Sequence, residues 1–165
     1  MTANQWVLHA SPLIALCRIN LDQLFSELAD QVIVPTAVVA EIDQGPPNDA
    51  ARLFLATGRL SVLATPNPPS HLATWDLGAG ETAVLAYCLA NPGWTAVLDD
   101  RAARRFASVY QVTIIGTLGI ILLARRRGLV SSAGTVIRRL QQSGFRIDDR
   151  IVREALKTIV NEDWA

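Results

Sequence analysis

The chain has 165 residues, half of them apolar, with fifteen basic and fifteen acidic residues. That size and composition fit one domain with an ample core. No apolar run reaches the roughly 18 residues of a membrane span, and no secretory signal is visible, so we expect a cytoplasmic protein. Cys17 and Cys88 lie in apolar helical patterns without the spacing of metal ligands. We expect both to be buried free thiols in a reducing compartment.

The neutral net charge conceals an uneven distribution along the chain. Residues 1–100 carry ten acids against three arginines, whereas residues 101–165 carry eleven arginines and one lysine against five acids. The planar guanidinium of arginine suits bidentate recognition of phosphate. The basic half therefore either binds nucleic acid or presents a solvated helical face, and the sequence leaves both interpretations open.

Short apolar runs alternate with helical patterns through the first half. Ser11 followed by Pro12 indicates a helix start, with Ser11 as N-cap and proline at the first helical position. Apolar periodicity and turn residues give the other boundaries. The elements predicted in chain order are strand 6–8, helices 11–18 and 22–29, strand 32–34, helix 35–41, turn 44–48, helix 50–57, strand 60–63 and surface loop 65–70.

The same alternation continues through the second half. Asp148 is placed to cap a closing helix. The predicted elements are helix 80–90, strand 95–98, helix 101–109, strand 112–115, a helix from Thr117 to about residue 127, and helices 132–143 and 148–160. Strands separated by helices of this length predict an α/β fold with a mostly parallel sheet covered on both faces.

The strand at 95–98 runs directly into two carboxylates, Asp99 and Asp100. This placement puts them at the carboxyl edge of the sheet, where open α/β folds have their active crevices. Because adjacent like charges repel, we expect a divalent cation or a basic neighbour beside them. Capping of the next helix explains one of the two carboxylates but hardly both.

Two further acids occupy related places. Glu41 lies a few residues beyond a strand, and Glu81 lies in the first helical turn after Gly78 and Gly80. Each also has a simpler explanation, since Glu41 could be a solvated helix end and Glu81 could interact with the helix dipole. Taken singly, these acids are weak signals.

The order of these residues, together with the sequence around them, resembles the PIN-domain ribonucleases. The similarity is greatest to a PIN-like subfamily related to the toxins of toxin–antitoxin pairs. Six segments carry the resemblance: HASPLIALCRI from His9, VIVPTAVVAEI from Val32, DLGAGETAVLAYCLA from Asp76, VLDDRAARRFAS from Val97, VTIIGTLGIILLARRRGLV from Val112 and QSGFRIDDRIVREAL from Gln142. They extend over nearly the whole chain in register, so the ordered set is more specific than any one motif.

The resemblance implies one PIN-like domain over residues 1–165, with three α/β/α layers and about five strands. It also implies a cluster of acids that binds Mg²⁺ or Mn²⁺ and hydrolyses phosphodiester bonds in RNA. The implied partners are an RNA substrate, a cognate antitoxin and a second copy of the chain. The implied site residues are Glu41, Glu81, Asp99 and Asp100 as catalytic acids, Glu41, Glu81 and Asp100 as metal ligands, Ser11 and Thr117 as supporting residues, and Arg101, Arg104 and Arg105 as RNA-binding residues.

The chain departs from the family pattern at its start, where a sequence like D-T-S-P-L-I is expected. His9 and Ala10 stand in place of the aspartate and threonine, which removes one anionic oxygen. Mg²⁺ prefers oxygen ligands, whereas imidazole suits Mn²⁺ moderately and Zn²⁺ well. Three interpretations stay open: His9 binds a softer metal, the remaining acids support a weakened site, or catalysis is lost and a nucleic-acid- or protein-binding module remains.

Two other features have competing explanations. The segment after His9 is rich in large apolar residues, which suits either the core or a dimer contact; they are Leu13, Ile14, Leu16, Leu21, Leu24, Phe25 and Leu28. The sequence Gly78-Ala79-Gly80 suggests a small nucleotide-binding protein, but this fingerprint is incomplete and does not follow a strand.

Overall fold

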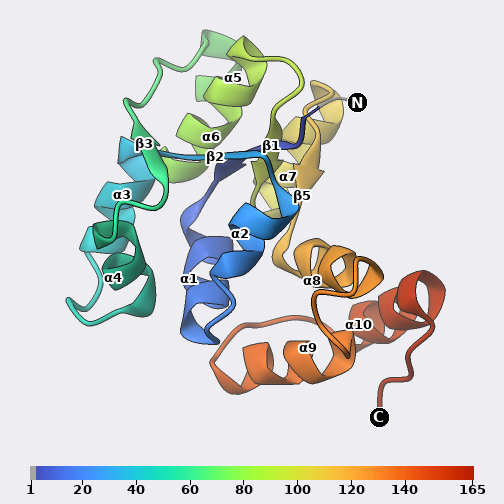
Figure 1. Cartoon of the computed structure of the whole chain (residues 1–165). Helices are drawn as coiled ribbons and strands as arrows, with labels where there is room; N and C mark the ends of the chain where they lie inside the picture. The colour runs from blue at the N-terminus through green and yellow to red at the C-terminus, as the bar shows by residue number, and fades with distance from the viewer. Residues whose placement is uncertain (1–2) are drawn as a thin grey trace.

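The computed structural model describes residues 3–165 and contains one five-stranded sheet (Figure 1). The strands are β1 (Gln5–Leu8), β2 (Gln31–Pro35), β3 (Ser61–Leu63), β4 (Thr95–Val97) and β5 (Ile114–Ile115). Their order is β3-β2-β1-β4-β5, and every neighbouring pair is parallel. The predicted α/β fold with about five mostly parallel strands is therefore confirmed, and the sheet is parallel throughout.

Helices cover both faces of the sheet. They are α1 (Ala10–Arg18), α2 (Gln23–Leu28), α3 (Thr36–Asp43), α4 (Ala50–Ala56), α5 (Ser70–Ala73), α6 (Ala79–Ala90), α7 (Arg101–Val109), α8 (Thr117–Arg126), α9 (Ala133–Gln142), α10 (Asp149–Ala155) and the π-helical segment η1 (Leu156–Val160). Helices α1, α2 and α8 pack together on one side, while α6 packs on β1, β2 and β4 from the other side, with α5 and α7 beside it. Within residues 3–165, no helix combines the length and apolar character that crossing a bilayer requires.

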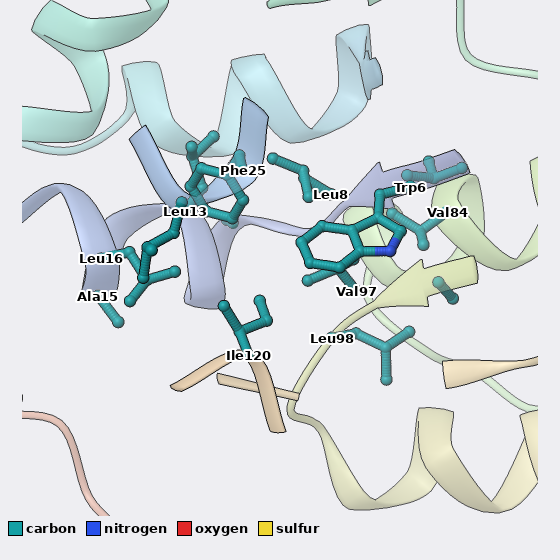
Figure 2. Close-up of a cluster of buried hydrophobic side chains, with 14 of the residues drawn as sticks. Trp6, Leu8, Leu13, Ala15, Leu16, Phe25, Val84, Val97, Leu98 and Ile120 are labelled. Atoms are coloured by element: carbon teal, nitrogen blue, oxygen red, sulfur yellow. The ribbon is translucent and has the colours of Figure 1, made fainter. Parts of the chain in front are cut away.

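The two central strands supply the middle of the core. Trp6 is 3% exposed, and Leu8 and Leu98 are fully buried, because helices cover both faces of these strands. Figure 2 shows these side chains in one buried cluster that also contains Phe25 and Ile120. Each large apolar side chain buried in this way contributes about 1.5–3 kcal/mol to folding. The core therefore fixes β1 and β4 side by side, and with them the residues that follow each strand.

The predicted boundaries differ from the structure in a few places. Helix α1 begins at Ala10 with His9 as its N-cap, so the assignment of Ser11 as N-cap was wrong. The hydroxyl of Ser11 donates a hydrogen bond to the carboxylate of Asp99 instead, at 3.0 Å. Helix α5 was not predicted, because only one of its four residues, Leu72, is buried. The predicted last helix is divided into α10 and η1, and β5 is shorter than expected.

The predicted cap of α10 is confirmed. Asp148 accepts a hydrogen bond from the backbone N–H of Arg150 at 2.7 Å. The pKa of the Asp148 carboxyl is held below its ordinary value. The largest cause is this backbone hydrogen bond, and the next is the hydrogen bond from the Arg150 side chain.

Most of the apolar side chains of α1 and α2 belong to the core. Leu13, Leu16, Leu24, Phe25 and Leu28 are each at most 1% exposed, and the two others of the set pack partly against them. These residues therefore give no evidence for an apolar surface that a second copy would cover. The homodimer stays a prediction that rests on the family resemblance.

The two cysteines are buried free thiols, as predicted. Burial, the largest cause in each case, raises the pKa of both Cys17 and Cys88 to about 12. Because the thiolate is the reactive form, neither side chain is suited to nucleophilic chemistry or metal binding.

Candidate functional site

The predicted site residues gather at the carboxyl edge of the sheet. His9 follows β1, Asp99 and Asp100 follow β4, and Thr117 begins the helix after β5. Strands β2 and β3 lie on one side of β1, and β4 and β5 lie on its other side, so the order of the strands reverses between β1 and β4. Loops diverge at such a reversal and leave a crevice between the two central strands. The site therefore lies where this fold class most often binds ligands.

Three side chains in this region are placed so that they could jointly hold a metal ion. One ligand atom from each of His9, Glu41 and Glu81 lies within 4.8 Å of the other two. His9 Nε2 lies 3.3 Å from Glu41 Oε2 and 3.6 Å from Glu81 Oε2. The side chains are 10%, 31% and 17% exposed, respectively. The structure thus brings together two predicted ligands, Glu41 and Glu81, with the residue that replaces the family's aspartate.

The two glycines before Glu81 make room for these carboxylates. A Cβ atom on Gly80 would lie 2.5 Å from Glu41 Oε2, and one on Gly78 would lie 2.5 Å from Glu81 Oε2. The backbone N–H of Gly80 also donates to Glu41 Oε1 at 2.7 Å, which anchors the carboxylate at the positive end of α6.

This arrangement also argues against the nucleotide-binding interpretation. The glycines follow α5 rather than a strand, and the space beside them holds two carboxylates. Those charges would repel a phosphate group placed there.

Asp99 forms a second polar group beside the first. Its carboxylate accepts hydrogen bonds from Thr117 N at 2.8 Å, from Thr117 Oγ1 at 2.7 Å and from Ser11 Oγ at 3.0 Å. Ser11 lies in the first turn of α1 and Thr117 in the first turn of α8. Asp99 therefore ties both helices to the end of β4, and the two predicted supporting residues contact Asp99.

Asp100 points elsewhere. Its Oδ2 accepts a hydrogen bond from Ala103 N at 2.9 Å, which makes it the N-cap of α7. It is exposed and is not a member of the group formed by His9, Glu41 and Glu81. The structure separates the acid pair into one inward carboxylate and one helix cap. The family resemblance predicts a metal-binding role for Asp100, whereas its place as a helix cap outside the group of His9, Glu41 and Glu81 predicts none.

We expect Asp100→Ala to lower the free energy of unfolding by about 1 kcal/mol, because the cap of α7 is lost. Asp100→Asn keeps an acceptor at the cap and should stay close to wild type in urea unfolding. We also expect Asp100→Asn to bind Mn²⁺ like wild type in calorimetry. A loss of Mn²⁺ binding without a loss of stability would instead identify Asp100 as a ligand.

The three predicted RNA-binding arginines of α7 are exposed, but they are not equivalent. A Cβ atom on Gly116 would lie 2.9 Å from both Arg104 Nη1 and Asp99 Oδ1. Arg104 therefore turns toward the Asp99 carboxylate and lines a hollow that Asp99 borders. Arg101 and Arg105 do not line this hollow.

Two residues near Asp99 were not singled out from the sequence. Phe145 and Arg146 lie between α9 and α10 and border two hollows, of about 430 and 490 Å³, that both reach Asp99. The motif QSGFRIDDRIVREAL contains both residues. That motif was the only signal in the sequence, and it pointed to no role for either side chain.

A family model described as PIN domain (DUF3368) matches residues 5–161. No curated protein matches the chain. The matched range contains all five strands and every residue of the two polar groups described above.

Proposed function

This chain belongs to the PIN-domain family, and on that premise we propose that it is a divalent-metal-dependent endoribonuclease. The observation that carries the proposal is the convergence of three side chains on one point: His9 directly after β1, Glu41 on α3 and Glu81 on α6. Two carboxylates and an imidazole are a typical set of metal ligands. Here they come from distant parts of the sequence, and their ligand atoms lie close enough together to bind one ion.

The donor set fits a divalent cation. His9 Nε2 faces both carboxylates, while His9 Nδ1 is buried and has no hydrogen-bond partner among residues 3–165. One nitrogen and two carboxylates suit Mn²⁺ or Zn²⁺ better than Mg²⁺, which prefers oxygen ligands alone. A cation bound there would supply Lewis acidity, polarising a phosphodiester and lowering the pKa of the attacking water.

The surrounding residues position this centre and its substrate. Asp99 fixes the first turn of α1 through Ser11, and His9 is the residue that caps this same turn. Arg104 offers an exposed guanidinium on the Asp99 side, where it can pair with a substrate phosphate. Binding of RNA should therefore weaken as the salt concentration rises.

A catalytically inactive module that binds nucleic acid or protein is the second candidate. It is favoured by the contacts of His9, which lies within ion-pair distance of both Glu41 and Glu81. In this candidate the contacts between His9 and the two carboxylates are structural and need no cation. Cleavage of single-stranded RNA that requires Mn²⁺ and is absent from Glu41→Gln would exclude this candidate.

Restoring the family's aspartate tests the role of His9. We expect His9→Asp to raise the Mg²⁺-supported cleavage rate relative to the Zn²⁺- or Mn²⁺-supported rate by about tenfold or more, because an oxygen ligand replaces a nitrogen. Rates with each ion would be measured on one RNA, with His71→Asp, an exposed histidine on α5, as the matched control. An unchanged order of metal preference would contradict a ligand role for His9.

We further propose that the nuclease is the toxin of a toxin–antitoxin pair, on the strength of the family resemblance. Expression of the wild-type chain in a bacterium should then arrest growth, and expression of Glu41→Gln should not. Co-expression of a cognate antitoxin should restore growth. Normal growth with an active nuclease would contradict the toxin role alone.

A further inference from the structure

A hollow of about 430 Å³ separates α1 from residues 143–146 and reaches Asp99. Its volume lies within the range of about 300–1,000 Å³ that is typical of small-molecule sites. Ile14, Ala15 and Phe145 give it apolar walls, and Arg18, Ser143 and Arg146 give it a polar edge. A nucleobase has two flat apolar faces and a polar edge, so its polarity matches that of the residues lining this hollow.

The turn after α9 holds Phe145 in place. Gly144 has a φ of +102°, a conformation that side-chain-bearing residues rarely adopt. The backbone N–H of Phe145 then donates to Leu140 O at 3.0 Å, which closes the turn. The ring therefore borders the hollow from a fixed backbone, as a stacking platform requires.

Two of the arginines near Asp99 have no carboxylate partner in the described part of the chain, and Arg104 Nη1 donates a hydrogen bond to the backbone carbonyl of Leu98 at 3.5 Å. Within residues 3–165, no carboxylate forms an ion pair with Arg104 or Arg146. Arg18, by contrast, is paired with Asp49 at 2.9 Å. Arg146 borders both hollows beside Asp99, so its charge is available for a phosphate at the point where the two hollows meet.

We propose that this hollow binds one unpaired nucleotide of a single-stranded RNA, with its base against Phe145 and an adjoining phosphate against Arg146. The inference rests on the proposed nuclease function and adds a subsite that holds one part of its substrate. A base in a duplex is paired and stacked, so only an unpaired base can enter the hollow.

The neighbouring hollow of about 490 Å³ is less suited to a base. Its walls are mostly aliphatic, including Leu118, Ile151 and Ile159, and its charged residues are Asp99, Arg104 and Arg146. A base placed among these side chains would leave its polar edge without partners. This hollow therefore supplies control positions for the test.

The proposal is tested by fluorescence anisotropy of a labelled single-stranded RNA octamer, titrated with the Glu41→Gln protein so that the RNA stays intact. Adding Phe145→Ala should raise the Kd about 5- to 150-fold, which corresponds to the loss of one stacked base. Phe145→Trp should restore binding, which separates stacking from a folding defect. Ile151→Ala, which affects only the second hollow, should leave the Kd unchanged.

The charge of Arg146 is tested by salt titration of the same complex. Arg146→Ala should reduce the slope of log Kd against log salt concentration by about 0.7, the value for one phosphate contact on a single strand. Arg153→Ala removes the same charge from an exposed position on α10 and should leave the slope unchanged. A duplex of the same sequence should bind more weakly and be insensitive to Phe145→Ala.

Equal effects of Phe145→Ala and Ile151→Ala, or equally tight binding of the duplex, would overturn the proposed subsite. If the wild type cleaves RNA with a metal ion while Phe145→Ala and Arg146→Ala bind normally, the subsite fails and the nuclease function stands. If the octamer binds through Phe145 but no metal supports cleavage, the subsite stands and the nuclease function fails.

Discussion

Glu41→Gln is expected to abolish Mn²⁺ binding at the centre formed by His9, Glu41 and Glu81, and to lower the RNA cleavage rate by about 10³-fold. The substitution removes an anionic ligand, and metal catalysis supplies several kcal/mol of transition-state stabilisation. The amide oxygen of glutamine can still accept the hydrogen bond from Gly80 N, so the fold should be retained. Calorimetry with Mn²⁺ and a cleavage assay measure the two effects.

Glu27→Gln is the matched control for this prediction. Glu27 is exposed on α2 and is not a member of the metal-binding group, so the same change in charge should leave both measurements unaltered. If Glu41→Gln binds Mn²⁺ and cleaves RNA like Glu27→Gln, the assignment of Glu41 as a ligand is wrong.

Gly80→Ala should remove metal binding almost as completely, although it changes no ligand. The new methyl group would lie 2.5 Å from Glu41 Oε2 and 2.8 Å from Oε1, so the carboxylate must move away. The displaced atoms are the end of a flexible side chain, and alanine favours a helix over glycine by about 1 kcal/mol. The free energy of unfolding should therefore change little while the affinity for Mn²⁺ falls.

The control for this prediction is Gly134→Ala in α9, where the nearest atoms would lie at 3.8 Å. It should raise the free energy of unfolding by about 0.5–1 kcal/mol and leave Mn²⁺ binding unchanged. Equal Mn²⁺ affinities in the two alanine variants would mean that the position of the Glu41 carboxylate does not matter to the centre.

The sheet and the edge that carries the site were predictable from the sequence. Apolar runs such as 32–34 and 95–98 alternate with helical segments, and that pattern predicts parallel strands covered on both faces. The position of an acid directly after such a strand then predicts the sheet edge on which it lies. Local sequence patterns suffice for these conclusions, because the conclusions require only the period of the apolar residues and the order of the strands and helices.

Side-chain directions at the site could not be predicted in the same way. Asp99 and Asp100 are adjacent, and neighbours in an extended chain point to opposite sides. The partners Ser11 and Thr117 on one side, and the cap of α7 on the other, decide which carboxylate turns inward. Ser11 itself has the pattern of an N-cap, and only the folded chain shows that Asp99 binds its hydroxyl instead.

Contacts between distant segments account for the remaining gaps. Gly80 is needed because the carboxylate of Glu41 lies against it, and no local pattern reveals that approach. Phe145 and Arg146 reach Asp99 from the turn after α9, at the far end of the chain. Their place beside the site follows from the packing of the C-terminal helices on α8, which depends on the whole core.

The most direct test of the metal centre is an anomalous diffraction measurement on crystals soaked in Mn²⁺. We predict a peak about 2.0–2.3 Å from His9 Nε2 and from one carboxylate oxygen each of Glu41 and Glu81. At saturating Mn²⁺, no peak among these three side chains, or a peak on Asp99 and Asp100 without His9, would contradict the proposal.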